Sequence, residues 1–249
     1  MIPVQKNMRA QAGFTLVELA IVMIIIGLLI AGVLKGQALI GNAKVTAQVA
    51  QVKSIDAATS TFKDMYSVLP GDITNPNTRL PNCLVAPCST PGDGNGTILP
   101  APGVAVAVGN EAADYFVHLS AADLITGINP LIGLVWGGQV PTGKVGGGID
   151  VGSSAGNVAL AAGAEAAAST MGGVWLYLHM TPGTPAAAAE SPFTANEAQR
   201  IDTKVDDGVA TTGSVSAFGT AGTCWVAATG VYAEATQGKI CGLYIRIQG

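Results

Sequence analysis

The sequence predicts an α+β protein with one long N-terminal helix followed by a head of short strands and loops. An apolar run near the N-terminus continues into a stretch whose apolar residues recur three and four positions apart, which is the periodicity of a helix. Beyond residue 69 the chain is rich in glycine and proline, and short apolar segments alternate with turn residues. This second pattern is typical of strands joined by loops.

The apolar run covers residues 14–34 and contains a single charged residue, Glu18. A helix of this length spans about 30 Å, which is enough to cross a bilayer. A signal anchor would explain the length and the apolar character. It would not explain the acid, because an unpaired carboxylate in hydrocarbon costs about 2–3 kcal/mol or more and therefore needs a partner.

Residues 35–68 predict an amphipathic continuation of the same helix that ends before Pro70, because proline cannot continue a helix. The expected organisation is a leader at 1–13, a helix at 14–68 whose first part (14–34) is the membrane segment, and a head at 69–249. The apolar stripe of the second part is Val45, Val49, Val52, Ile55, Phe62 and Tyr66.

Within the head, helices are expected at 110–126 and 194–205. The second of these opens with Thr194 and Glu197 in the spacing of a capping box and stops before Gly208,. Strands are expected at 131–136, 147–151, 174–179, 209–217, 223–227 and 243–247, the last two as an antiparallel pair. A connector rich in proline and alanine should run from 182 to 192.

The charge balance excludes some functions. The formal charge is −4, the cations are scattered, and there are two histidines. Because binding to a phosphate backbone needs clustered cations, we expect no nucleic-acid partner. A histidine-rich metal centre is equally disfavoured.

The start of the chain carries the most specific motif. A secretory signal is cut after its apolar stretch, but here the small residue, Gly13, precedes it,. The run Gly13–Glu18 (GFTLVE), placed after a short basic leader and at the head of the apolar span, resembles the processing site of type IV prepilins and of type II secretion pseudopilins. The resemblance implies cleavage after Gly13, N-methylation of Phe14, and pairing of Glu18 with the terminal amine of a neighbouring subunit.

The same resemblance implies a pilin fold, in which the long helix packs on a small antiparallel sheet with loop-rich insertions. It implies a structural subunit, not an enzyme, that polymerises into a type IV pilus or, as the alternative, a type II secretion pseudopilus. The expected partners are further copies of the chain, minor pilins or other pseudopilins, the prepilin peptidase and methyltransferase, and an inner-membrane assembly platform. The expected location is the bacterial inner membrane as a single-pass precursor and then a periplasmic or cell-surface fibre.

Four cysteines lie in the head, outside the cytoplasm if the leader is of this type, where disulfides persist. Three pairings are possible, and proximity in sequence favours Cys83–Cys88 and Cys224–Cys241,. A four-thiolate zinc site is the alternative, although the spacing lacks two Cys-x-x-Cys pairs.

One segment has the composition of a cation loop. Asp93, Asn95 and Thr97 place oxygen side chains at alternate positions between glycines, as in half of a calcium-binding EF-hand loop,. The twelfth position is Val104 instead of an acid, so further ligands would have to come from elsewhere, such as Asp72 or Glu111. The segment predicts either a plain Gly/Asn turn or a weak calcium site; no other cofactor is expected.

Two motifs of enzymes are better explained as turns. Residues 152–156 match the Gly-x-Ser-x-Gly pattern of hydrolases, for which His179 is the only histidine downstream,. Residues 138–144 match part of a phosphate-binding loop, but Val145 replaces the hydroxyl residue that such a loop needs,. A membrane-tethered enzyme or ligand-binding domain is the alternative from another functional class.

Overall fold

The structure is a computed structural model that describes residues 13, 15–154, 171–184, 190–219 and 222–247. The chain divides into two compact units, one up to Ala43 and one from Lys44 onward. Helix α1 (Leu16–Tyr66) contributes residues to both. It ends two residues before the expected position, where Ser67 takes a positive φ of 55°.

In the first unit, α1 exposes its large apolar side chains on all sides. Leu16 is 87% exposed and Ile30 is 56% exposed. The helix is long and apolar enough to cross a membrane,. The predicted membrane-type helix is therefore present, and its apolar surface is available for lipid or for another protein chain.

In the second unit, α1 is amphipathic, as predicted. The buried side chains of its stripe are Val45, Val49, Val52, Ile55 and Phe62. They join the hydrophobic core of the head. The free energy gained by burying this stripe holds the second part of α1 to the head, since burial of each such side chain contributes about 1.5–3 kcal/mol.

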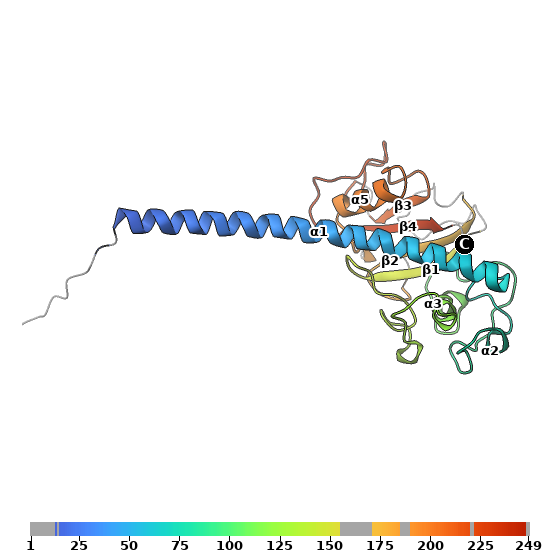
Figure 1. The fold of residues 1–249 in the computed structure, drawn as a ribbon. Helices are drawn as coiled ribbons and strands as arrows, with labels where there is room; N and C mark the ends of the chain where they lie inside the picture. Colours follow the sequence, from blue (N-terminus) through green and yellow to red (C-terminus); the bar gives the residue numbers. More distant parts are fainter. Residues whose placement is uncertain (1–12, 14, 155–170, 185–189, 220–221, 248–249) are drawn as a thin grey trace, which may run out of the picture. The chain divides into compact units, whose positions relative to one another are not determined.

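Within the described residues of the head, the sheet has four antiparallel strands in the order β1-β2-β4-β3. The strands are β1 (Gly148–Ser154), β2 (Gly173–His179), β3 (Val215–Gly219) and β4 (Cys241–Ile247). The register aligns Ile149, Leu178, Leu243 and Ala217 in one row across the sheet, so one face is aliphatic. The second part of α1 lies against this sheet (Figure 1), which confirms the predicted α+β layout.

Loop residues cover the other face of the sheet. The hydroxyl of Tyr177 donates to the carbonyl oxygen of Val104 at 3.4 Å. The backbone of Pro100 comes so close to Gly152 that a Cβ there would lie 2.6 Å from the Pro100 oxygen. Only glycine can occupy this position of β1, because any side chain would push the loop away.

The described part of the head also contains the helices α2 (Pro76–Arg79), α3 (Glu111–Ala121), the 3₁₀ helix η1 (Pro130–Ile132) and α5 (Ala195–Val205). The predicted capping box of α5 is present: the Thr194 hydroxyl accepts from the Glu197 N–H, and the Glu197 carboxylate accepts from the Thr194 N–H. Helix α3 is shorter than the predicted 110–126, because Asp123 adopts a positive φ of 57°. The sequence had not indicated α2.

Two predicted strands are wrong and one is displaced. In place of a strand at 131–136, η1 begins after Asn129, whose side chain accepts from the Leu131 N–H. In place of a strand at 223–227, the chain forms a turn in which Trp225 bridges to Tyr232; the expected pairing with 243–247 is therefore absent, and β4 pairs with β2 and β3 instead. The strand expected at 209–217 is β3, shifted toward its C-terminal end. Residues 185–189 of the expected connector lie outside the described residues.

Candidate assembly site

The first turn of α1 is closed by a capping box. The Glu18 carboxylate accepts two hydrogen bonds from Thr15, one from its N–H at 2.9 Å and one from its hydroxyl at 2.8 Å. In return, the Thr15 hydroxyl accepts from the Glu18 N–H at 3.3 Å. These bonds satisfy donors that the start of a helix otherwise leaves without partners.

This cap gives Glu18 a role within its own chain that the sequence analysis missed. The signal was present, because Thr15 and Glu18 have the Thr-x-x-Glu spacing that identified the start of α5,. Both hydrogen bonds that the Glu18 carboxylate accepts involve its Oε2 atom, and the side chain is exposed. A monomer can therefore keep this carboxylate charged at its helix start, where the helix dipole also favours an anion. Gly13 is exposed, and Phe14 lies outside the described residues.

A second cluster of functional candidates lies in the head at residues 93–97. Asp93 accepts from the side-chain amide of Asn95 at 2.7 Å, and Asn95 accepts from the Thr97 N–H at 2.7 Å. The Thr97 hydroxyl also donates to the side-chain oxygen of Asn95, so the three side chains bond to one another along the loop. The structure adds two carboxylates from distant segments, Asp72 and Glu111, which come within 4.8 Å of Asp93.

Backbone N–H groups already occupy much of this carboxylate cluster. Asp72 accepts from the N–H groups of Gly94, Asn95 and Gly96 at 2.7–3.1 Å. Glu111 accepts from those of Asp93 and Leu99. Burial raises the pKa of both Asp72 and Glu111, and the N–H donors oppose this rise. The hydrogen bonds to Glu111 hold the loop against the start of α3. A divalent cation would reduce the electrostatic repulsion between the carboxylates of the cluster.

We expect weak calcium binding at this cluster, because a cation would have to compete with N–H groups for the same oxygens. Titration calorimetry on the full chain in detergent should show a calcium response that Asp93→Ala abolishes. Asp64→Ala, which removes an exposed acid of α1 outside the cluster, should retain it. A flat calcium titration of the unmodified chain would leave residues 93–97 as a structural turn.

The cysteines form the two favoured pairs. Cys83–Cys88 and Cys224–Cys241 are disulfides with Cα–Cα distances of 5.1 and 5.3 Å. With all four cysteines bonded, the four-thiolate zinc site is excluded. His118 packs beside the first disulfide: its Nδ1 accepts from the Gly71 N–H, and its Nε2 lies 2.9 Å from the Cys88 carbonyl oxygen. Burial lowers the pKa of His118 to about 4, so it is neutral at pH 7.

The enzyme-like motifs do not form sites. The strand register pairs Ser154 with Gly173 and His179 with Gly148, so the serine and the histidine lie about 20 Å apart at opposite ends of β1 and β2. His179 instead bonds to the buried Asp150 at 2.8 Å. No helix follows Lys144, since β1 begins at Gly148, and a phosphate-binding loop requires one. Ala155 and Gly156 of the hydrolase pattern lie outside the described residues.

A comparison with known protein families supports the motif found at the start of the chain. Residues 8–34 match the family model described as "Prokaryotic N-terminal methylation motif", which is the signature of type IV pilins and pseudopilins. This motif supports a protein of the type IV pilin or pseudopilin class and points to a structural subunit instead of an enzyme. No curated protein and no solved structure matches the chain.

Proposed function

We propose that this chain is the structural subunit of a type IV pilus, which polymerises after its leader is removed and its new N-terminus is methylated. The observation that carries the proposal is the methylation motif at residues 8–34 at the head of a membrane-type helix. The exposed apolar surface of α1 supports it, because a surface of this kind outside a bilayer has to be covered by other protein chains.

The chemistry of the first turn of α1 supports assembly from identical copies. Glu18 is the single charged residue of α1 before Lys35. When neighbouring chains bury it, an ammonium at Phe14 of another copy compensates its charge, and each group removes the desolvation cost of the other. This pair sets the axial register of the subunits.

The proposal also assigns partners and a location. A membrane peptidase and methyltransferase processes residues 13 and 14, an inner-membrane platform extracts the subunit, and minor pilins join the fibre. The methylation motif and the apolar helix fit a single-pass membrane precursor. The finished fibre lies on the cell surface; recovery of fibres only from the periplasm would assign the chain to a secretion pseudopilus instead.

The mature chain is expected to begin at Phe14. Intact-mass measurement of protein extracted from membranes of cells that contain the peptidase should show loss of residues 1–13 and the gain of one methyl group. Gly13→Leu should block this loss, because the peptidase requires a small residue before the cleaved bond. Retention of Lys6 and Arg9 in the unmodified protein would contradict the expected processing.

A further inference from the structure

A cavity with a volume of about 460 Å³ lies at one end of the sheet, where β1 ends and β2 begins. Three strands contribute to its wall: Ser154 is the last residue of β1, Gly173 is the first of β2, and Ile247 is the last of β4. The last turn of α1 and residues 96–97 of the loop before β1 complete the wall. All of these residues belong to the second unit of the chain. Cavities of about 300–1,000 Å³ hold small organic ligands.

The charged residues of the cavity wall are both cations. Lys63 comes from α1 and Arg246 from β4, and no acidic residue is among the described residues that line the cavity. The chain as a whole has a formal charge of −4, so this pair runs against its overall charge. Two like charges that face the same space repel each other, and an anion bound in that space offsets the repulsion. The charge distribution therefore favours an anionic ligand.

The Arg246 guanidinium is held on one side and exposed on the other. Its Nε donates to the Gly172 carbonyl oxygen at 2.8 Å. The group lies so close to Gly173 that a Cβ there would be 3.0 Å from Nε. Among the described residues, its Nη1 and Nη2 groups have no hydrogen-bond acceptor. Because a planar guanidinium binds a carboxylate or phosphate through two parallel hydrogen bonds, this arginine is pre-oriented for such a group.

Two hydroxyl side chains complete the polar part of the wall, and their hydrogen bonds fix what each can still offer. The Ser153 hydroxyl oxygen accepts from the Ile98 N–H at 2.9 Å, so its own O–H is left to donate. The Thr97 hydroxyl donates to the side-chain oxygen of Asn95, so its oxygen is left to accept. The wall therefore offers donors to an anionic group and an acceptor to a hydroxyl group of the same ligand.

We propose that this cavity binds a small organic anion, a molecule with one carboxylate or phosphate group and a hydroxylated body. The charged group of the ligand lies against Arg246 and Lys63, and its hydroxyl groups contact Ser153 and Thr97. The site goes beyond the proposed function, because it lies in the head and needs neither leader cleavage nor polymerisation to bind its ligand.

Titration calorimetry of the full chain in detergent at low ionic strength tests the site with three sugars. Glucuronate carries a carboxylate, glucose 6-phosphate carries a phosphate, and glucose carries neither. At least one of the two acidic sugars should bind, which identifies the charged group, and glucose should not. Arg246→Gln should weaken this binding about tenfold or more, because a charge-assisted pair of hydrogen bonds is lost. Lys63→Gln should weaken it about threefold, since the lysine is exposed,.

Lys53→Gln is the matched control. Lys53 is an exposed lysine of the same helix that does not line the cavity, so this variant should bind like the wild type. Melting temperatures show whether each variant folds, and Lys63→Gln still tests the site if Arg246→Gln does not fold. A flat titration with both acidic sugars, equal binding of glucose, unchanged affinity in either folded cavity variant, or equal weakening by Lys53→Gln would overturn the site. None of these results would affect the proposed function.

Discussion

Glu18→Ala is expected to stop fibre formation while leaving membrane insertion and leader cleavage close to wild type. In a fibre that buries α1, the substitution removes the only carboxylate available to a neighbour's terminal ammonium. An ammonium left unpaired in an apolar environment costs several kcal/mol, and every 1.4 kcal/mol weakens an interaction about tenfold. The measurement compares processed protein in the membrane with sheared, sedimented fibre.

Two further variants separate the charge pair from the capping box. Thr15→Ala removes the cap at a cost of about 1 kcal/mol but keeps the carboxylate, so it should still form fibres. Glu18→Asp keeps the charge on a shorter side chain and should give an intermediate yield. Abundant normal fibre from Glu18→Ala would mean that apolar packing alone sets the register. Equal loss from Thr15→Ala would mean that the cap, and not the charge pair, is required.

Removal of the Cys224–Cys241 disulfide is expected to destabilise the head more than removal of the Cys83–Cys88 disulfide. The cysteines are 17 residues apart, and a closed loop of this length contributes about 3 kcal/mol in the chain-entropy account. Cys241 also begins β4, where its N–H donates to the Phe193 carbonyl oxygen at 3.0 Å and its carbonyl oxygen accepts from the Phe193 N–H at 2.9 Å. Loss of the bridge therefore loosens a strand that pairs on both sides.

The double variant Cys224→Ser/Cys241→Ser should lower the melting temperature by about 6–12 °C, as expected for a loss of 3 kcal/mol in a domain of this size. The matched control is Cys83→Ser/Cys88→Ser, whose cysteines are only five residues apart; its expected loss is about 2 kcal/mol. Thermal unfolding followed by circular dichroism measures both. A larger drop in melting temperature for Cys83→Ser/Cys88→Ser would contradict the prediction that the Cys224–Cys241 disulfide contributes more to stability.

The sequence predicted the elements whose pattern is long or locally specified. Helix α1 shows its apolar run and its stripe over many turns, and α5 carries a complete capping box. The wrong strands lie in short apolar runs, where periodicity cannot distinguish a strand from a turn. Leu131 belongs to such a run, yet it is 81% exposed in η1, because Pro130 and the Asn129 side chain start a 3₁₀ turn there.

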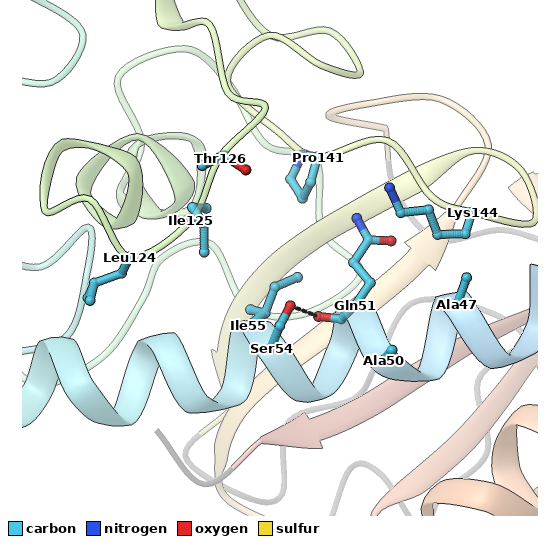
Figure 2. A pocket seen from close by; sticks show the side chains of 10 residues that line it. All are labelled: Ala47, Ala50, Gln51, Ser54, Ile55, Leu124, Ile125, Thr126, Pro141 and Lys144. Carbon is cyan, nitrogen blue, oxygen red and sulfur yellow. Dashed lines mark hydrogen bonds between the residues drawn. The ribbon is translucent and has the colours of Figure 1, made fainter.

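The candidate sites also differ in how far the sequence alone could identify them. The processing motif lies within six consecutive residues, so it could be identified from the sequence alone. The fold brings together three separate segments, which carry Asp72, Asp93 and Glu111. The sequence alone could only suggest Asp72 and Glu111 as additional ligands. The cavity beside the second part of α1 (Figure 2) could not be predicted, because Ile55 and Leu124, which both line it, are 69 residues apart in the chain and no local pattern links them.

The most direct test of the central claim is to identify the protein in sheared filaments and to determine its first residue. Filaments from cells that express this chain as the only source of subunit should yield, as their main component, a protein that begins with N-methylated Phe14. The same preparation from Glu18→Ala cells should contain almost none of it, although the processed chain is present in their membranes. Filaments that lack this chain, or processed protein that never leaves the membrane in wild-type cells, would contradict its assignment as a fibre subunit.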